Sequence, residues 1–245
     1  MARVIYKPRG RAREYSPLAL NLYRGCSHGC TYCYAPGCMH TTSCAWHSTV
    51  TPREGLLKKL EADAREMEGD PRRVLLCFLS DPYQPADDVH QLTRQALEIL
   101  GRHRMKAQIL TKGGTRACRD FDLMRQHDVH LGVSLSFVTD EARAKWEPEA
   151  ASVEDRVELL RRAHRAGIYT WVSVEPVILP DEALAVIRRF RRYVRFWKVG
   201  KLNHMRDIER GIDWPAFRGA AVKALDRAGA DYYIKKDLLA ARATP

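Results

Sequence analysis

Short apolar runs alternate with longer amphipathic segments along most of the chain. Six runs rich in Val, Ile, Leu and aromatic residues have the length of buried strands, and they span residues 18–23, 74–79, 106–111, 129–137, 169–174 and 195–199. Between them, apolar residues recur three and four positions apart, as on amphipathic helices. This spacing predicts helices over about 52–67 and 214–228, after Asp87 and Asp88, through Val153, Val157 and Leu160, and from near Asp181.

Strands that alternate with helices are typical of a parallel sheet with crossover helices. Six β/α units are too few to close an eight-stranded barrel, so we expect an α/β fold of the open, partial TIM-barrel type, with a lateral gap for a substrate. In such folds the chemistry gathers at the carboxyl ends of the strands. Polar residues follow or end each predicted strand: Cys26, Ser80 and Asp81, Lys112, Ser134 and Ser136, Glu175, and Lys201 and Asn203.

The length of 245 residues and the apolar content of 45% fit one large domain. The only compositionally unusual stretch is residues 7–13, rich in Arg, Pro and Gly. We therefore expect a basic N-terminal arm over residues 1–17, ordered only against the body or a substrate, and a single domain over 18–245.

No apolar stretch is long enough to cross a bilayer and no secretory signal is evident, so we expect a cytoplasmic protein without membrane contact. Its seven cysteines then suit metal ligands or core positions better than disulfides. The formal charge of +11 favours nucleic acid as a partner. Part of this excess, at 188–195, alternates with apolar residues at helical spacing, which a solvated helix face explains equally well.

Three cysteines form the most informative motif of the chain. Cys26, Cys30 and Cys33 have the spacing C-x3-C-x2-C, and thiolates on so short a loop can converge on one soft inorganic centre. Three thiolates leave one iron of a four-iron, four-sulfur cluster without a protein ligand, and a cofactor can bind there. A zinc knuckle or three unrelated buried thiols are the alternatives.

Together with Tyr32, this run resembles the radical S-adenosylmethionine (SAM) superfamily. The stretches 21–36, 79–85, 109–114, 171–178 and 198–203 are similar to its spore photoproduct lyase-like branch, most closely to uncharacterised bacterial members. The resemblance implies a partial-barrel domain over 18–245. It also implies reductive cleavage of SAM at a 4Fe-4S cluster, which gives a 5′-deoxyadenosyl radical that abstracts hydrogen from a substrate.

The resemblance also implies roles for single residues. Tyr32 would contact the adenine through its backbone, Ser80 the methionine amine, Lys112 the methionine carboxylate, and Ser134 or Ser136 the ribose. Glu175 would orient the ribose, contact substrate or pair with Lys201, and a structural ion pair explains it equally well. Tyr34 matches a lyase tyrosine and would be catalytic.

The lyase's hydrogen-donating cysteine has no counterpart here, because Leu79 occupies its place. Cys77 is the nearest thiol, and we expect it to be a core residue facing away from Ser80. Cys38, His40, Cys44 and His47 follow the cluster loop and either bind zinc, assist a second cluster or are incidental.

The leading hypothesis is a radical SAM enzyme that receives electrons from a flavodoxin or ferredoxin, with nucleic acid as the substrate favoured by charge and relatives. Radical modification of a peptide or small metabolite is the alternative within enzymes. A nonenzymatic, metal-stabilised nucleic-acid-binding protein is the alternative from another class. The sequence does not indicate an oligomeric state.

Overall fold

A computed structural model describes residues 3–242 and has at its centre a seven-stranded sheet in which every neighbouring pair is parallel. The strands follow sequence order across the sheet: β1 (Leu18–Leu20), β4 (Val74–Leu76), β5 (Ala107–Thr111), β6 (His130–Ser134), β7 (Thr170–Val177), β8 (Phe196–Lys201) and β9 (Asp231–Ile234). A separate antiparallel pair joins β2 (Tyr23–Arg24) to β3 (Thr51–Pro52). The predicted α/β fold with an open parallel barrel is confirmed.

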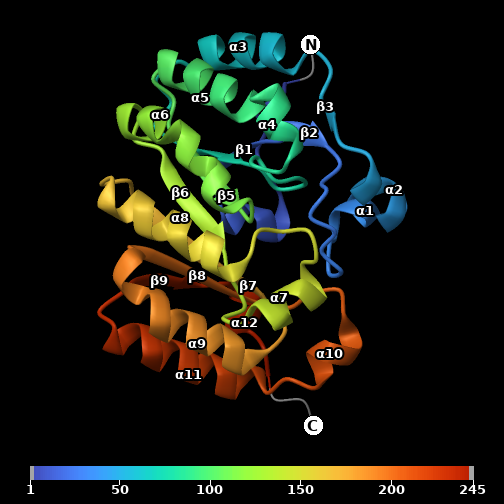
Figure 1. The fold of residues 1–245 in the computed structure, drawn as a ribbon, viewed down its shortest axis with the longest axis vertical. Coiled ribbons are helices and arrows are strands. Elements are labelled where there is room, and N and C mark those ends of the chain that lie inside the picture. Colours follow the sequence, from blue (N-terminus) through green and yellow to red (C-terminus); the bar gives the residue numbers. More distant parts are fainter. Residues whose placement is uncertain (1–2, 243–245) are drawn as a thin grey trace.

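The long helices follow one another down one side of the molecule, and four short helices lie on the opposite side (Figure 1). The long ones are α3 (Leu56–Glu66), α5 (Leu92–Arg102), α8 (Val153–Arg165), α9 (Pro180–Phe190) and α11 (Trp214–Arg227). The four short ones are α1 (Ala35–Cys38), α2 (Ser43–Ser48), α7 (Asp140–Trp146) and α10 (Arg206–Arg210). The remaining helices are α4 (Ala86–His90), α6 (Phe121–Gln126), α12 (Lys236–Leu239) and the 3₁₀ helices η1 (Gly10–Glu14), η2 (Gly114–Asp120) and η3 (Arg191–Tyr193).

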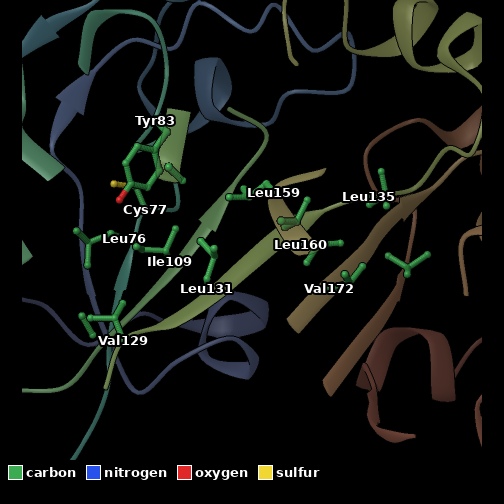
Figure 2. Packing of buried hydrophobic residues seen from close by; sticks show 14 of the residues in the cluster. Leu76, Cys77, Tyr83, Ile109, Val129, Leu131, Leu135, Leu159, Leu160 and Val172 are labelled. Carbon is green, nitrogen blue, oxygen red and sulfur yellow. The ribbon is translucent and has the colours of Figure 1, made fainter. Parts of the chain in front are cut away.

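The main core lies between the sheet and its crossover helices. Leu76, Ile109 and Leu131 come from three neighbouring strands and join the same buried cluster as Leu159 and Leu160 of α8 (Figure 2). Successive residues of a strand face opposite sides of a sheet. The residues at the alternate positions, among them Ala19, Leu75 and Trp171, therefore form a second cluster on the other face of the sheet, which is the inner face of the partial barrel.

The N-terminal arm begins against the main core and continues onto this inner face. The backbone N–H groups of Val4 and Ile5 donate to Asp63 of α3 at 2.6 and 2.9 Å, and Tyr6 pairs with Ala19 of β1. Further along, the Tyr15 ring joins the inner cluster around Ala19, Leu75 and Trp171. The arm thus fills part of the lateral gap of the partial barrel, which the sequence analysis expected to be free for a substrate. The domain boundary at residue 17 stays a prediction.

All six predicted strands occur, but β1, β4 and β6 each end three residues earlier than expected. After β4, the backbone N–H groups of Phe78 and Leu79 donate to the side-chain oxygen of Asn21, both at 3.0 Å, instead of to a neighbouring strand. The sequence analysis missed β9, whose apolar run is short and lies at the edge of the sheet. Among residues 3–242, no helix is long and apolar enough to span a membrane.

Candidate active site

The three motif cysteines lie on the loop between β2 and α1. Cys26 and Cys30 are buried, Cys33 is half-buried, and none of them is in a disulfide. The buried side chain of Gln84 holds this loop from below, since it accepts from Ser27 N at 3.0 Å and donates to Gly25 O at 3.4 Å. Gly25 has φ +88°, and a Cβ there would lie 2.0 Å from a backbone oxygen, so the sharp turn into the loop requires glycine.

The chemistry of the three thiols fits the ligands of an iron–sulfur cluster. Burial raises the pKa of Cys26, Cys30 and Cys33, that of Cys30 to about 12, and the three are close enough for their charges to interact. Within residues 3–242, no group of three or more His, Cys, Asp or Glu side chains is placed to hold one metal ion. Ligands of zinc must meet at one atom, whereas each thiolate of a four-iron cluster binds a different iron.

A cavity of about 320 Å³ opens beside the cysteine loop, within the size range of small-molecule sites. Ser80 lines it, and its buried hydroxyl has no hydrogen-bond partner among the described residues. The next residue, Asp81, joins the loop after β4 to the end of β5 by accepting from the Thr111 hydroxyl and the Lys112 backbone N–H, both at 2.6 Å. The arrangement leaves Ser80 as an unused polar group facing a space that a ligand can fill.

Lys112 and Tyr32 line the same cavity and rest on a buried ion pair. Glu147 and Arg156 are at most 1% exposed, and their side chains approach to 2.6 Å. The Tyr32 hydroxyl donates to Glu147. Burial would raise the pKa of Glu147, but the charges of Arg156 and Lys112 outweigh it and the pKa is lowered. Burial likewise disfavours charged Lys112, yet Cys30 and Glu147 keep its pKa raised.

The other predicted residues separate into those that reach the cavity and those that do not. Ser134 lines it, whereas Ser136 is buried but is not a lining residue, because β6 ends at Ser134 and the alternation does not continue. Tyr34 lines it and donates a hydrogen bond from its hydroxyl to Phe78 O at 2.8 Å.

Cys77 is buried as expected, but it lines the cavity together with Ser80 rather than facing away. The strand that would have separated them ends at Leu76.

Glu175 lines the far end of the cavity, where its carboxylate is already in use. It accepts from Lys235 Nζ at 2.7 and 2.8 Å and from the Tyr15 hydroxyl. The alternative in which Glu175 pairs with Lys201 is wrong, since Lys201 pairs with Glu209 at 2.9 Å. Burial is the main reason why the pKa of Glu175 is raised despite Lys235.

Around this ion pair the chain is tightly packed. A Cβ at Gly200 would lie 2.6 Å from the Glu175 carboxyl, so only glycine leaves room for it. Lys198 donates to the backbone oxygens of Glu14 and Tyr15, both at 2.8 Å. Burial and the neighbouring charge of Lys235 lower the pKa of Lys198 to about 8.

The Cys/His group after the loop is scattered in this structure. Cys38 and Cys44 are exposed, while the His47 ring lies 2.7 Å from the backbone oxygen of Cys26. His40 is exposed, and the four residues form no ligand group in the described chain. His47 thus supports the cluster loop.

The sequence analysis did not identify several residues of the site. Arg156 lies beside Val157 on the face of α8 that packs against the core. A charged residue at a core-facing position of this helix was the signal that could have identified it. Glu147, Tyr15 and Lys235 carry no comparable signal, because only the folded chain brings the α7–α8 turn, the arm and the end of β9 to the cavity.

An open parallel barrel with a three-cysteine loop beside a cavity that Ser80, Lys112 and Ser134 line at the strand ends defines a cofactor-dependent α/β enzyme fold. A model of the radical SAM superfamily matches residues 20–194, more than half of the chain. The chain therefore belongs to the radical SAM superfamily. Members of this superfamily are enzymes, and membership implies SAM and an iron–sulfur cluster as cofactors.

The chain is similar to several curated proteins. An uncharacterised protein of Methanocaldococcus jannaschii is 28% identical over 75% of this chain and 70% of its own length. An uncharacterised protein of Mycobacterium tuberculosis is 29% identical over 65% of this chain and 49% of its own length. A radical SAM Nalpha-GlyT isomerase of Pseudomonas phage M6 is 25% identical over 77% of this chain and 38% of its own length. The alignments thus span half or less of the mycobacterial and phage proteins.

Two solved structures share the fold. A mutant of spore photoproduct lyase superposes with a TM-score of 0.73 at 13% identity, covering 94% of this chain and 78% of the lyase. SuiB of Streptococcus suis, solved with S-adenosylmethionine, gives a TM-score of 0.66 at 10% identity, covering 89% and 50%. At such identities, the likeness establishes the fold alone.

Proposed function

We propose that Cys26, Cys30 and Cys33 hold a four-iron, four-sulfur cluster whose free iron binds SAM in the adjoining cavity. The observation that carries the proposal is the buried, unpartnered Ser80 hydroxyl beside this three-thiol loop. When bound, the cluster and SAM supply a 5′-deoxyadenosyl radical for hydrogen abstraction.

The residues around the cavity suit the parts of SAM. The Ser80 hydroxyl can accept from the methionine amine, and Lys112 supplies the cation that a buried carboxylate needs. The Tyr32 backbone would contact the adenine and Ser134 the ribose, while Tyr34 would act on the substrate side. Ser136 lies outside the cavity lining, and the engaged carboxylate of Glu175 favours a structural ion pair.

The substrate we favour is a nucleic acid. Spore photoproduct lyase has been solved with a dinucleoside spore photoproduct, and the chain carries a charge of +11. A peptide is the second candidate, because SuiB has been solved with the precursor peptide SuiA. Leu79 replaces the lyase-type donor cysteine, which separates this protein's reaction from dimer repair.

The test is anaerobic reconstitution with iron and sulfide, followed by reduction with dithionite or a flavodoxin or ferredoxin system. The protein should form 5′-deoxyadenosine from SAM, and Cys30→Ala should abolish it. Cys44→Ala, which removes an exposed thiol outside the loop, is the matched control and should retain both iron and turnover. Equal turnover by Cys30→Ala and the wild type would refute the cluster assignment.

A further inference from the structure

Two neighbouring hollows beside the N-terminal arm are lined by cations and by no acidic residue. The first, of about 390 Å³, includes Arg3, Arg9 and Arg53; the second, of about 570 Å³, includes Lys7, Arg9, Arg13 and Arg72. They share Arg9, and we call the two together the arm groove. Such a surface attracts polyanions and repels cations.

Most of these cations are not neutralised by the protein itself. Arg3 pairs with Glu66 and Arg72 with Asp70. For Lys7, Arg9, Arg13 and Arg53, no carboxylate within residues 3–242 lies at ion-pair distance, and all four residues are exposed. Their charges are therefore available to a ligand.

The arm groove is continuous with the cavity of the candidate active site. Ala12, Tyr34 and Phe78 line both the cavity and the first hollow. Tyr34 is 44% exposed, and the hydrogen bond from its hydroxyl to Phe78 O fixes the ring at the junction. An exposed aromatic ring beside a row of cations is the combination that binds single strands, with phosphates on the cations and a base stacked on the ring.

We propose that the arm groove binds a single-stranded nucleic acid. Its backbone phosphates lie against Arg9, Arg13 and Arg53, and one base stacks on Tyr34 at the entrance to the cavity. In a duplex the faces of the bases are covered by their neighbours, so Tyr34 cannot stack on them. Single-stranded nucleic acid is then the substrate class of the proposed enzyme. Binding in the arm groove does not depend on SAM, and only the reaction that follows rests on the proposed function.

The protein has a second basic surface that serves as the matched control. Arg188, Arg191 and Arg192, on α9 and η3, are exposed and have no acidic partner at ion-pair distance in the described chain. None of them lines the cavity or the arm groove. Each triple variant removes three positive charges, but the surfaces differ in shape, and Phe190 and Tyr193 beside the control arginines are half-buried whereas Tyr34 is exposed.

The experiment measures binding of a short fluorescent oligothymidylate to anaerobically purified protein across a salt series, without SAM. In the triple variant Arg9→Ser, Arg13→Ser, Arg53→Ser, the slope of log K against log salt should fall by about 2, at about 0.7 for each lost phosphate contact. The variant Arg188→Ser, Arg191→Ser, Arg192→Ser should keep the wild-type slope. Tyr34→Leu should weaken binding roughly 5- to 100-fold at an unchanged slope.

Equal loss of slope in both triple variants, or in neither, would overturn the proposal, as would equal competition by duplex DNA or by polyglutamate. Competition with oligouridylate tells whether DNA or RNA is preferred, and either preference supports a single-strand site. SAM cleavage without substrate should be unchanged in the variant Arg188→Ser, Arg191→Ser, Arg192→Ser. A protein that binds strands but does not cleave SAM would refute the proposed function and leave the arm groove standing.

Discussion

The two ends of the cavity are built in different ways. The cluster end lies at the carboxyl ends of β4, β5 and β6, where Asp81 fixes the backbone at Lys112 and the charge of the buried Glu147 acts on the Lys112 side chain. The far end is assembled from β7, β8 and β9 together with the arm, around the Glu175–Lys235 pair. The first end therefore depends on the sheet, the cysteine loop and the α7–α8 turn, whereas the second depends on segments near both ends of the chain.

The largest effect should come from breaking the ion pair at the cluster end. Arg156→Met leaves Glu147 buried with only Lys112 as counter-charge, so the free energy of unfolding should fall by about 3–5 kcal/mol. Lys112 is then drawn to Glu147, and SAM binding should weaken too. Urea unfolding and equilibrium dialysis with SAM measure the two effects.

Lys235→Met is the counterpart at the far end, and it should destabilise the protein while SAM affinity stays within about twofold of the wild type. The double variant Glu147→Gln, Arg156→Met should recover part of the lost stability, because it leaves no unpaired charge. If Lys235→Met weakened SAM binding as much as Arg156→Met, the division of the cavity into two ends would be wrong.

A smaller effect is expected from Lys112→Ala, which removes one charge-assisted contact to the SAM carboxylate. The loss should be roughly 1.5–3 kcal/mol of binding free energy, or about ten- to a hundredfold in affinity, with iron content unchanged. Lys201→Ala removes a lysine from the far end and should leave the affinity unchanged. SAM affinity equal to the wild type in Lys112→Ala would remove Lys112 from the cofactor site.

The same division explains what the sequence could predict. Strands, crossover helices and the residues after β4 and β5 follow from local periodicity and from the rule that parallel strands present their carboxyl ends at one edge. Contacts that join distant segments leave no such pattern. Nothing in the arm indicates that Tyr15 would meet Glu175, 160 residues away. Cys77 was placed on the wrong side because strand alternation was extended beyond Leu76, where backbone hydrogen bonds donated to the Asn21 side chain replace the ladder.

The smallest effect concerns Lys198, which lies at the far end of the cavity and has a lowered pKa. Its pKa is lowered to about 8 in the folded protein, against about 10.4 in an unfolded chain. Between these values the unfolded state holds the proton and the folded state does not, so this group makes stability rise with pH. The difference in unfolding free energy between wild type and Lys198→Met should therefore increase from pH 7.5 to 9.5, by at most about 1.4 kcal/mol per pH unit. A difference that stays constant over this pH range would mean that Lys198 keeps its charge where it packs against Tyr15 and Trp171.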